Sequence, residues 1–113
     1  MKSVVCLFAA ALVPAALWSQ GLTVAVRGQP AAYTIVRPAN ASPSQIHAAG
    51  EFQKFTEQMT GVKLPVIADD APLPGRAILL GGTRHTAQIL GSAPDLAPLG
   101  EDGFRLVTRP PHL

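Results

Sequence analysis

The residues best placed to do chemistry form one short run, GGTRH, which follows an apolar stretch and opens a helical pattern. A strand that ends in two glycines and leads into a helix exposes backbone N–H groups and the positive end of the helix dipole, which suits an anion. The run matches neither GxxxxGK[ST] nor GxGxxG, so a tight strand-to-helix turn that requires glycine is the alternative interpretation. The candidate ligand-binding residues are Gly81, Gly82, Thr83, Arg84 and His85.

The three histidines do not form a metal site in the sequence pattern. His47, His85 and His112 have no second histidine, cysteine or carboxylate at a metal-ligand spacing such as HxxxH, which argues against zinc. His47 falls on the polar side of a predicted helix, and His112 lies close to the C-terminal residue. Nothing in the pattern indicates any other cofactor.

Four of the seven acidic residues occur as two pairs, Asp69-Asp70 and Glu101-Asp102, both in predicted loops. A glycosidase needs two carboxyl groups that face each other across a cleft, at about 5 Å or about 6.5–9.5 Å. Sequence neighbours in surface loops do not provide that arrangement, and we interpret both pairs as solvated turn residues. No GxSxG nucleophile elbow is present either. The residues therefore predict no catalytic group in this chain.

The first 19 residues have the pattern of a secretory signal peptide. Lys2 provides a positive start, residues 4–17 are predominantly apolar with Pro14 near the end, and small residues follow at Ser19 and Gly21. The apolar run is too short for a membrane-spanning helix. We predict cleavage near Ser19 or Gly21 and a secreted or periplasmic protein. A buried hydrophobic helix is the alternative.

Removal of this segment changes the composition of the chain. Cys6, the single cysteine, would leave with it, so the mature chain would form no disulfide. Without Lys2 there are eight basic residues against seven acidic ones, a net charge of +1. This balance predicts no attraction to nucleic acid or to an anionic membrane. About 92 residues remain, which is enough for one domain.

Residues 42–61 predict the best-defined helix. Ser42 is the expected N-cap, Pro43 stands at the first helical position, Gln45 completes a capping box and Gly61 ends the helix. We expect its apolar stripe, roughly 120° wide, to pack across one face of a sheet. The stripe consists of Ala48, Ala49, Phe52, Phe55 and Met59.

Five runs rich in β-branched or apolar residues predict strands at 22–27, 33–36, 62–67, 76–80 and 103–108. The first two are close enough to form a hairpin. Pro65 places the third at a sheet edge or at the end of a strand. The continuous apolar run at 76–80 is the best candidate for a central strand covered on both faces.

A second helix is predicted from a Thr83 cap to Leu90, with Gly91 ending it. The predicted order is therefore β-β-α-β-β-α-β. This order predicts an α+β fold, with a small mixed sheet and one long amphipathic helix on one face. The domain would cover residues 22–108, and residues 109–113 would form a tail.

Three stretches resemble a known domain when their order and spacing are taken together. They are YTIVRPANASPSQIHAAGEFQKFTEQMTGVKLPVI, AILLGGT and LGEDGFRLVT. The resemblance is to the N-terminal accessory domain of the α-glucuronidase and β-hexosaminidase type (domain 2-like), as found in secreted bacterial glycoside hydrolases. It covers residues 22–108.

The resemblance implies an accessory α/β domain that precedes a (β/α)₈ catalytic barrel, with the catalytic groups on the barrel. In the family a further strand and helix usually follow the last of the three stretches, so the resemblance also implies a fragment. The expected function is a non-catalytic domain that supports a glycoside hydrolase barrel as its partner. The alternative is a free-standing secreted module that binds an anionic sugar, such as a uronate, at Gly81–His85. Neither hypothesis involves nucleic acid, or a membrane after signal cleavage.

Overall fold

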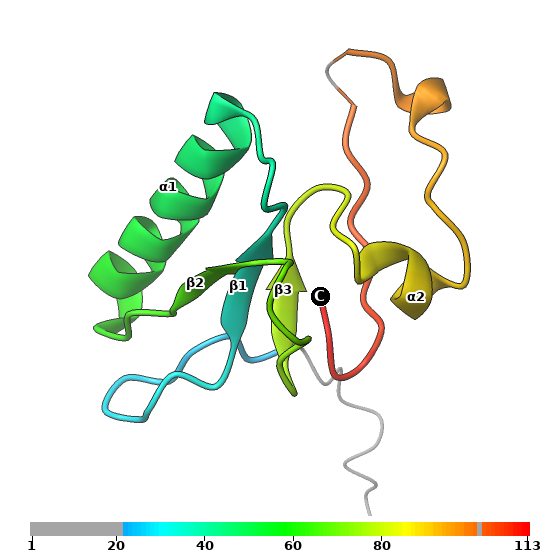
Figure 1. Ribbon diagram of the computed structural model, residues 1–113. Helices are drawn as coiled ribbons and strands as arrows, with labels where there is room; N and C mark the ends of the chain where they lie inside the picture. The colour runs from blue at the N-terminus through cyan, green and yellow to red at the C-terminus, as the bar shows by residue number, and fades with distance from the viewer. Residues whose placement is uncertain (1–21, 102) are drawn as a thin grey trace, which may run out of the picture.

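The structure is a computed structural model that describes residues 22–101 and 103–113. The predicted signal peptide and Asp102 lie outside the described residues. The described part has mixed α/β architecture with a small sheet and two helices (Figure 1). Its elements are β1 (Thr34–Arg37), α1 (Pro43–Thr60), β2 (Val66–Ala68), β3 (Ala77–Leu79), α2 (Thr86–Leu90) and the 3₁₀ turn η2 (Ala97–Leu99).

The sheet has three strands in the order β2-β1-β3, and both pairings are parallel. The prediction of a mixed sheet is therefore wrong for the described residues. β1 is the central strand: Ile35 is paired with Val66 on one side and with Ile78 on the other. Ile35 and Val36 are completely buried. The predicted central strand at 76–80 is instead the edge strand β3, whereas β2 lies at the other edge directly after Pro65, as predicted.

Residues 22–27 do not form the predicted first strand, and the predicted hairpin is absent from the described residues. The physical reason is that β1 has no free edge. The Ile35 N–H donates to the Pro65 carbonyl at 2.8 Å, and the Thr34 N–H donates to the Arg76 carbonyl at 3.1 Å on the opposite side. A hairpin partner would have to displace β2 or β3.

Residues 103–108 also lack the predicted strand, because the outer edge of β3 is paired elsewhere. The Leu113 N–H donates to the Ala77 carbonyl at 2.9 Å, and the Leu79 N–H donates to the Leu113 carbonyl at 2.7 Å. A turn that contains Pro110 and Pro111, with a bridge between residues 109 and 112, brings Leu113 to this position. Residues 109–113 are thus part of the fold rather than the predicted tail.

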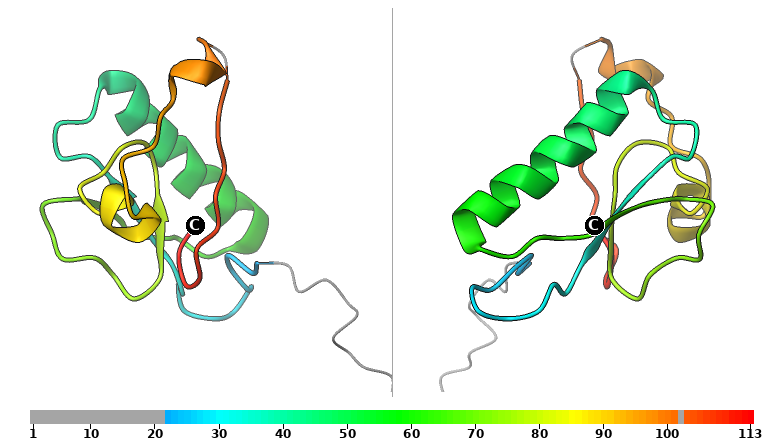
Figure 2. Two further views of the ribbon diagram at one scale, coloured as in Figure 1. Left: turned by 90° about the vertical axis from the view of Figure 1, so that its right-hand side faces the viewer. Right: turned by 60° about the vertical axis from the view of Figure 1, so that its left-hand side comes forward.

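The helix α1 has the caps that the sequence predicts. The Ser42 hydroxyl accepts from the Gln45 N–H at 3.2 Å, and the Gln45 side-chain carbonyl accepts from the Ser42 N–H at 2.9 Å. Gly61 ends the helix with φ at 79°, a left-handed conformation in which glycine is favoured. The helix lies across one face of the sheet, over β1 and β2 (Figure 2).

The face that α1 turns to the sheet differs from the predicted stripe. Ala49 and Thr56 are buried and Phe52 packs against the core, whereas Phe55 is 49% exposed and Met59 is 70% exposed. The loop after the helix accounts for this rotation. The Gln53 side-chain amide donates to the backbone carbonyl of the following loop, at residue 64, at 2.7 Å, and therefore holds a polar position next to the sheet.

The core lies between α1 and the sheet. It consists of Tyr33, Ile35, Ala49, Val62, Leu64 and Ile78.

The helix α2 starts at Thr86, later than predicted. Thr83 does not cap the helix; instead, the Thr86 hydroxyl accepts from the Thr83 N–H at 3.1 Å. Gly91 ends it, as predicted. Among residues 22–101 and 103–113, no helix has the length and apolar character needed to cross a membrane.

Candidate functional site

The five candidate residues Gly81–His85 lie in the turn between β3 and α2, where the carboxyl end of β3 meets the carboxyl ends of β1 and β2. The Arg84 N–H donates to Asp69 Oδ2 at 2.7 Å. The other oxygen, Asp69 Oδ1, accepts from the Ala39 N–H at 2.8 Å. The turn therefore binds an anion, and that anion is a carboxylate of the same chain.

Asp69 is a buried acidic residue, with 6% of its surface exposed. The backbone hydrogen bonds from Arg84 and then from Ala39 lower the pKa of its carboxyl below 3.8, because they favour the charged form. Burial acts in the opposite direction, and the nearby charges of Arg84 and His85 add to the lowering. Asp69 thus ties the turns that follow all three strands, which corrects the interpretation of this residue as a solvated turn carboxylate.

The feature that could have identified Asp69 as a residue of this site is its position directly after β2. The carboxyl ends of parallel strands meet at one edge of a sheet, and polar residues that follow such strands lie close together there. That argument requires a parallel sheet, whereas the sequence pattern predicts a mixed one. Its neighbour Asp70 is exposed, as predicted.

The remaining residues of the turn also have partners within the chain. Thr83 is buried, and its hydroxyl lies 2.9 Å from the Thr86 hydroxyl. His85 Nε2 lies 3.1 Å from the Ala71 carbonyl oxygen, within hydrogen-bonding distance. Gly81 has φ at 77°, in the left-handed region. These contacts hold the loop between β2 and β3 against the turn after β3.

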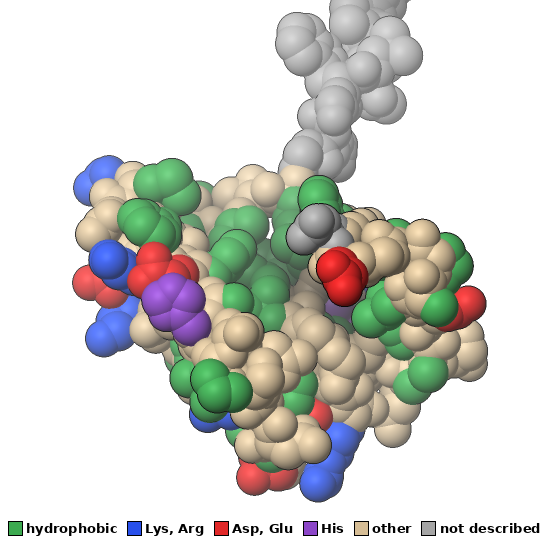
Figure 3. Space-filling model, turned by 90° about the horizontal axis from the view of Figure 1, so that it is seen from above, with side chains coloured by type: hydrophobic (Ala, Val, Ile, Leu, Met, Phe, Trp, Pro, Cys, Tyr) green, Lys and Arg blue, Asp and Glu red, His purple; other side chains and the backbone are tan. Residues whose placement is uncertain are grey.

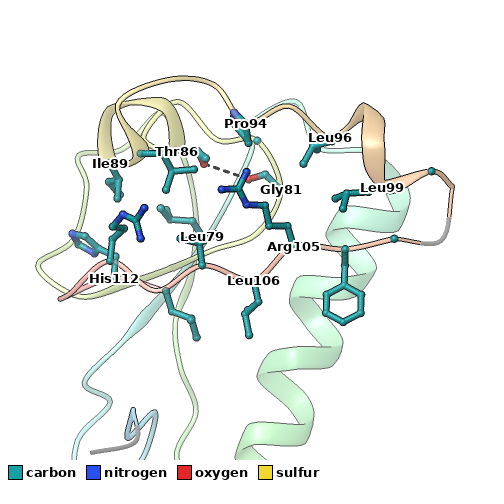
Figure 4. Close-up of a pocket in the computed structure, with 18 residues that line it drawn as sticks. Leu79, Gly81, Thr86, Ile89, Pro94, Leu96, Leu99, Arg105, Leu106 and His112 are labelled. Carbon is teal, nitrogen blue, oxygen red and sulfur yellow. Dashed lines mark hydrogen bonds between the residues drawn. The ribbon is translucent and has the colours of Figure 1, made fainter.

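The glycine pair faces a cavity of about 330 Å³ on the side where α2 lies. Leu79, Ile89 and Leu99 contribute apolar walls from β3, α2 and η2, and the segment 103–107 forms another wall. Figure 4 shows the Arg105 side chain extending from this segment toward Gly81 and Thr86. The Leu106 side chain points to the opposite side of the segment (Figure 4).

Two further cationic or titratable side chains line this cavity, Arg109 and His112. The Ala77 N–H donates to His112 Nδ1 at 3.1 Å. A neutral imidazole that accepts through Nδ1 carries its proton on Nε2, so the second ring nitrogen of His112 is a donor. No acidic side chain of the described residues lines the cavity.

The other residues considered from the sequence do not gather at this site. His47 on α1 and Glu101 after η2 are exposed, and Asp102 lies outside the described residues. The part of the chain that the structure describes contains no group of three or more His, Cys, Asp or Glu residues that could hold a metal ion.

Comparison of the chain with protein-family models, with curated proteins and with solved structures gives no match. Its function must therefore be inferred from the contacts and surfaces described above.

Proposed function

We propose that this chain is a non-catalytic accessory domain of a secreted carbohydrate-active enzyme, which packs against a glycoside hydrolase barrel. The observation that carries the proposal is the exposure of large apolar side chains on two separate elements. On the segment 103–107, Phe104 is 84% exposed and Leu106 is 74% exposed. On α1, Phe55 and Met59 are exposed next to the helix face that covers the sheet.

These side chains favour a docking role because of where they lie. Figure 3 shows hydrophobic side chains in a hollow between α1 and the arm that carries η2. Leu106 points to the α1 side of its segment (Figure 4). Complete burial of a Phe or Leu side chain stabilises by about 1.5–3 kcal/mol, so a partner seated here would gain several such contributions. Exposed apolar residues that gather in this way are typical of interaction surfaces.

The acidic residues support the non-catalytic part of the proposal. Within the two acidic pairs, Asp69 is bound by two backbone amides, Asp70 and Glu101 are exposed in two different loops, and Asp102 lies outside the described residues. A glycosidase needs one carboxyl group as acid and a second one facing it across the substrate. The alternative of an anionic sugar at Gly81–His85 gains no support from the contacts, since the Arg84 amide and the His85 ring have partners within the chain.

The proposed absence of catalysis is tested by incubating the purified chain with a panel of aryl-glycosides that includes an aryl-glucuronide and an aryl-N-acetylglucosaminide. We expect no release of the aryl alcohol above the buffer rate. Turnover that disappears in the variants Asp70→Asn or Glu101→Gln would refute the proposal.

The partner is tested by reading the DNA beyond the codon for Leu113. A reading frame that encodes alternating strands and helices, with carboxylates at the ends of strands, would agree with a barrel as the docking partner. If such a frame is present, the backbone amide of Leu106 should exchange its hydrogen more slowly in a chain extended by this frame than in the shorter chain. A frame that encodes no such pattern would contradict the choice of partner.

A further inference from the structure

We infer that the cavity between α2 and the segment 103–107 is a binding site for an aliphatic carboxylic acid. Its volume of about 330 Å³ falls within the range of about 300–1,000 Å³ that is typical of small-molecule sites. Such sites combine predominantly apolar walls with a small number of polar groups that fix the orientation of the ligand. Leu79, Ile89 and Leu99 provide walls of this kind from three different elements.

The polar groups of the cavity indicate the charge of the ligand. Arg105 and Arg109 both line it, and no acidic side chain of the described residues does so. A guanidinium group presents a planar fork of N–H donors that matches a carboxylate in a bidentate arrangement. Arg105 is exposed to solvent, and its side chain extends toward the glycine turn, so its charged group faces the cavity (Figure 4). A ligand with a negatively charged end is therefore favoured.

The apolar walls decide between classes of anion. A sugar acid would place several hydroxyl groups against Leu79, Ile89 and Leu99, where they would lack hydrogen-bond partners at a cost of about 1–3 kcal/mol each. A small inorganic anion would leave the apolar walls in contact with water. An acid with an aliphatic tail satisfies both parts of the site, because the tail contacts the walls and the carboxylate contacts the arginines.

This site shares the segment 103–107 with the proposed docking surface, because Phe104 and Leu106 line the cavity and are also exposed. Arg105 and Leu106 are neighbours in an extended segment, and their side chains point to opposite sides of it (Figure 4). The Arg105 side chain therefore lies on the side of the glycine turn and α2, whereas Leu106 points to the α1 side of the segment.

The experiment is a titration of the isotope-labelled chain with decanoate, followed by two-dimensional ¹H–¹⁵N NMR, at about pH 7, where aliphatic carboxylic acids are ionised. The matched uncharged probe is decanol, which has the same tail. We expect saturable shifts of the amide signals of Thr86, Ile89 and Val107, with decanoate bound more tightly than decanol. The signals of α1 should remain in place.

Two variants test the role of the charges, Arg105→Gln and Arg109→Gln. Each should weaken decanoate binding by up to about fivefold, the upper end for an exposed ion pair, and leave decanol binding unchanged. Lys63→Gln is the matched control, because it removes the same charge from an exposed position outside the cavity. It should leave both affinities unchanged.

Three results would overturn the inference. The first is an absence of saturable shifts with decanoate in the millimolar range. The second is equal binding of decanoate and decanol by the unaltered chain. The third is a loss of decanoate affinity in Lys63→Gln that equals the loss in the arginine variants, which would indicate attraction to the net charge and not to this cavity.

Discussion

The rotation of α1 about its axis is tested most sharply by one pair of variants, Phe52→Ala and Met59→Ala. Both residues belong to the apolar stripe that the sequence predicts, so the pattern alone expects both substitutions to destabilise the fold. In the structure Phe52 packs against the core, whereas Met59 is largely exposed. The two variants should therefore differ clearly in their free energies of unfolding.

The magnitudes follow from the burial of each side chain. Replacing a fully buried Phe by Ala costs about 3–5 kcal/mol, and because Phe52 is only partly buried we expect about 2–3 kcal/mol. Replacing a buried Met by Ala costs about 2–5 kcal/mol. Because less than a third of Met59 is buried, we expect Met59→Ala to cost no more than about 1 kcal/mol. A domain of about 90 residues has a stability of roughly 5–13 kcal/mol, so both variants should remain folded.

The assay is equilibrium unfolding in urea, followed by far-ultraviolet circular dichroism. With a slope of about 1 kcal/mol per molar urea, Phe52→Ala should lower the midpoint by about 2–3 M and Met59→Ala by about 1 M or less. Phe55→Ala, at a half-exposed position, should fall between them. Equal shifts for Phe52→Ala and Met59→Ala would mean that the helix presents the predicted stripe to the sheet, and would refute the reasoning.

Three further predictions concern the caps and the turn after β3. Asp69→Asn should flatten the dependence of stability on pH below about pH 4. The lowered pKa of Asp69 means that its carboxylate stabilises the fold above the unfolded pKa of 3.8, and that this contribution is lost as the pH falls through the folded pKa. Thermal unfolding between about pH 2 and pH 5 measures this dependence, and an unchanged slope of stability against pH would argue against the two amide contacts. Ser42→Ala should cost about 1 kcal/mol in urea unfolding, whereas Ser44→Ala, at an exposed helical position, should be nearly neutral. Gly81→Ala should cost about 1–2 kcal/mol, because φ is 77° and the added carbon would lie 2.8 Å from Nε2 of Gln45; an unaffected midpoint would contradict the left-handed conformation.

The helix α1 could be predicted from sequence because its signals are local. The Ser42 hydroxyl, Pro43 and the Gln45 amide act within one turn, and Gly61 acts at the end, so neighbouring residues determine the bounds. The rotation of the helix could not be predicted in this way. It depends on the contact between Gln53 and the loop after the helix, and hydrophobic periodicity does not include such a contact.

The sheet was harder to predict because strand pairing is a long-range property. The β-prone run at 22–27 is as good a strand candidate by composition as the run that forms β1, but the edges of β1 are taken by segments 30 or more residues away along the chain. The candidate site was hard to predict for the same reason. The residue types of Gly81–His85 predict either an anion-binding turn or a plain strand-to-helix turn, whereas Asp69 as the bound anion follows only from the parallel arrangement of the strands.

The pairing of Leu113 with β3 has a consequence for self-association. An exposed sheet edge offers unpaired N–H and C=O groups to any other extended chain, and this is a common route to aggregation. Leu113 occupies the hydrogen-bonding groups of Ala77 and Leu79 at this edge. Pro110 and Pro111, which precede it, have no N–H and cannot extend the ladder. The C-terminal turn therefore protects the β3 edge of this small sheet against edge-to-edge pairing with another copy.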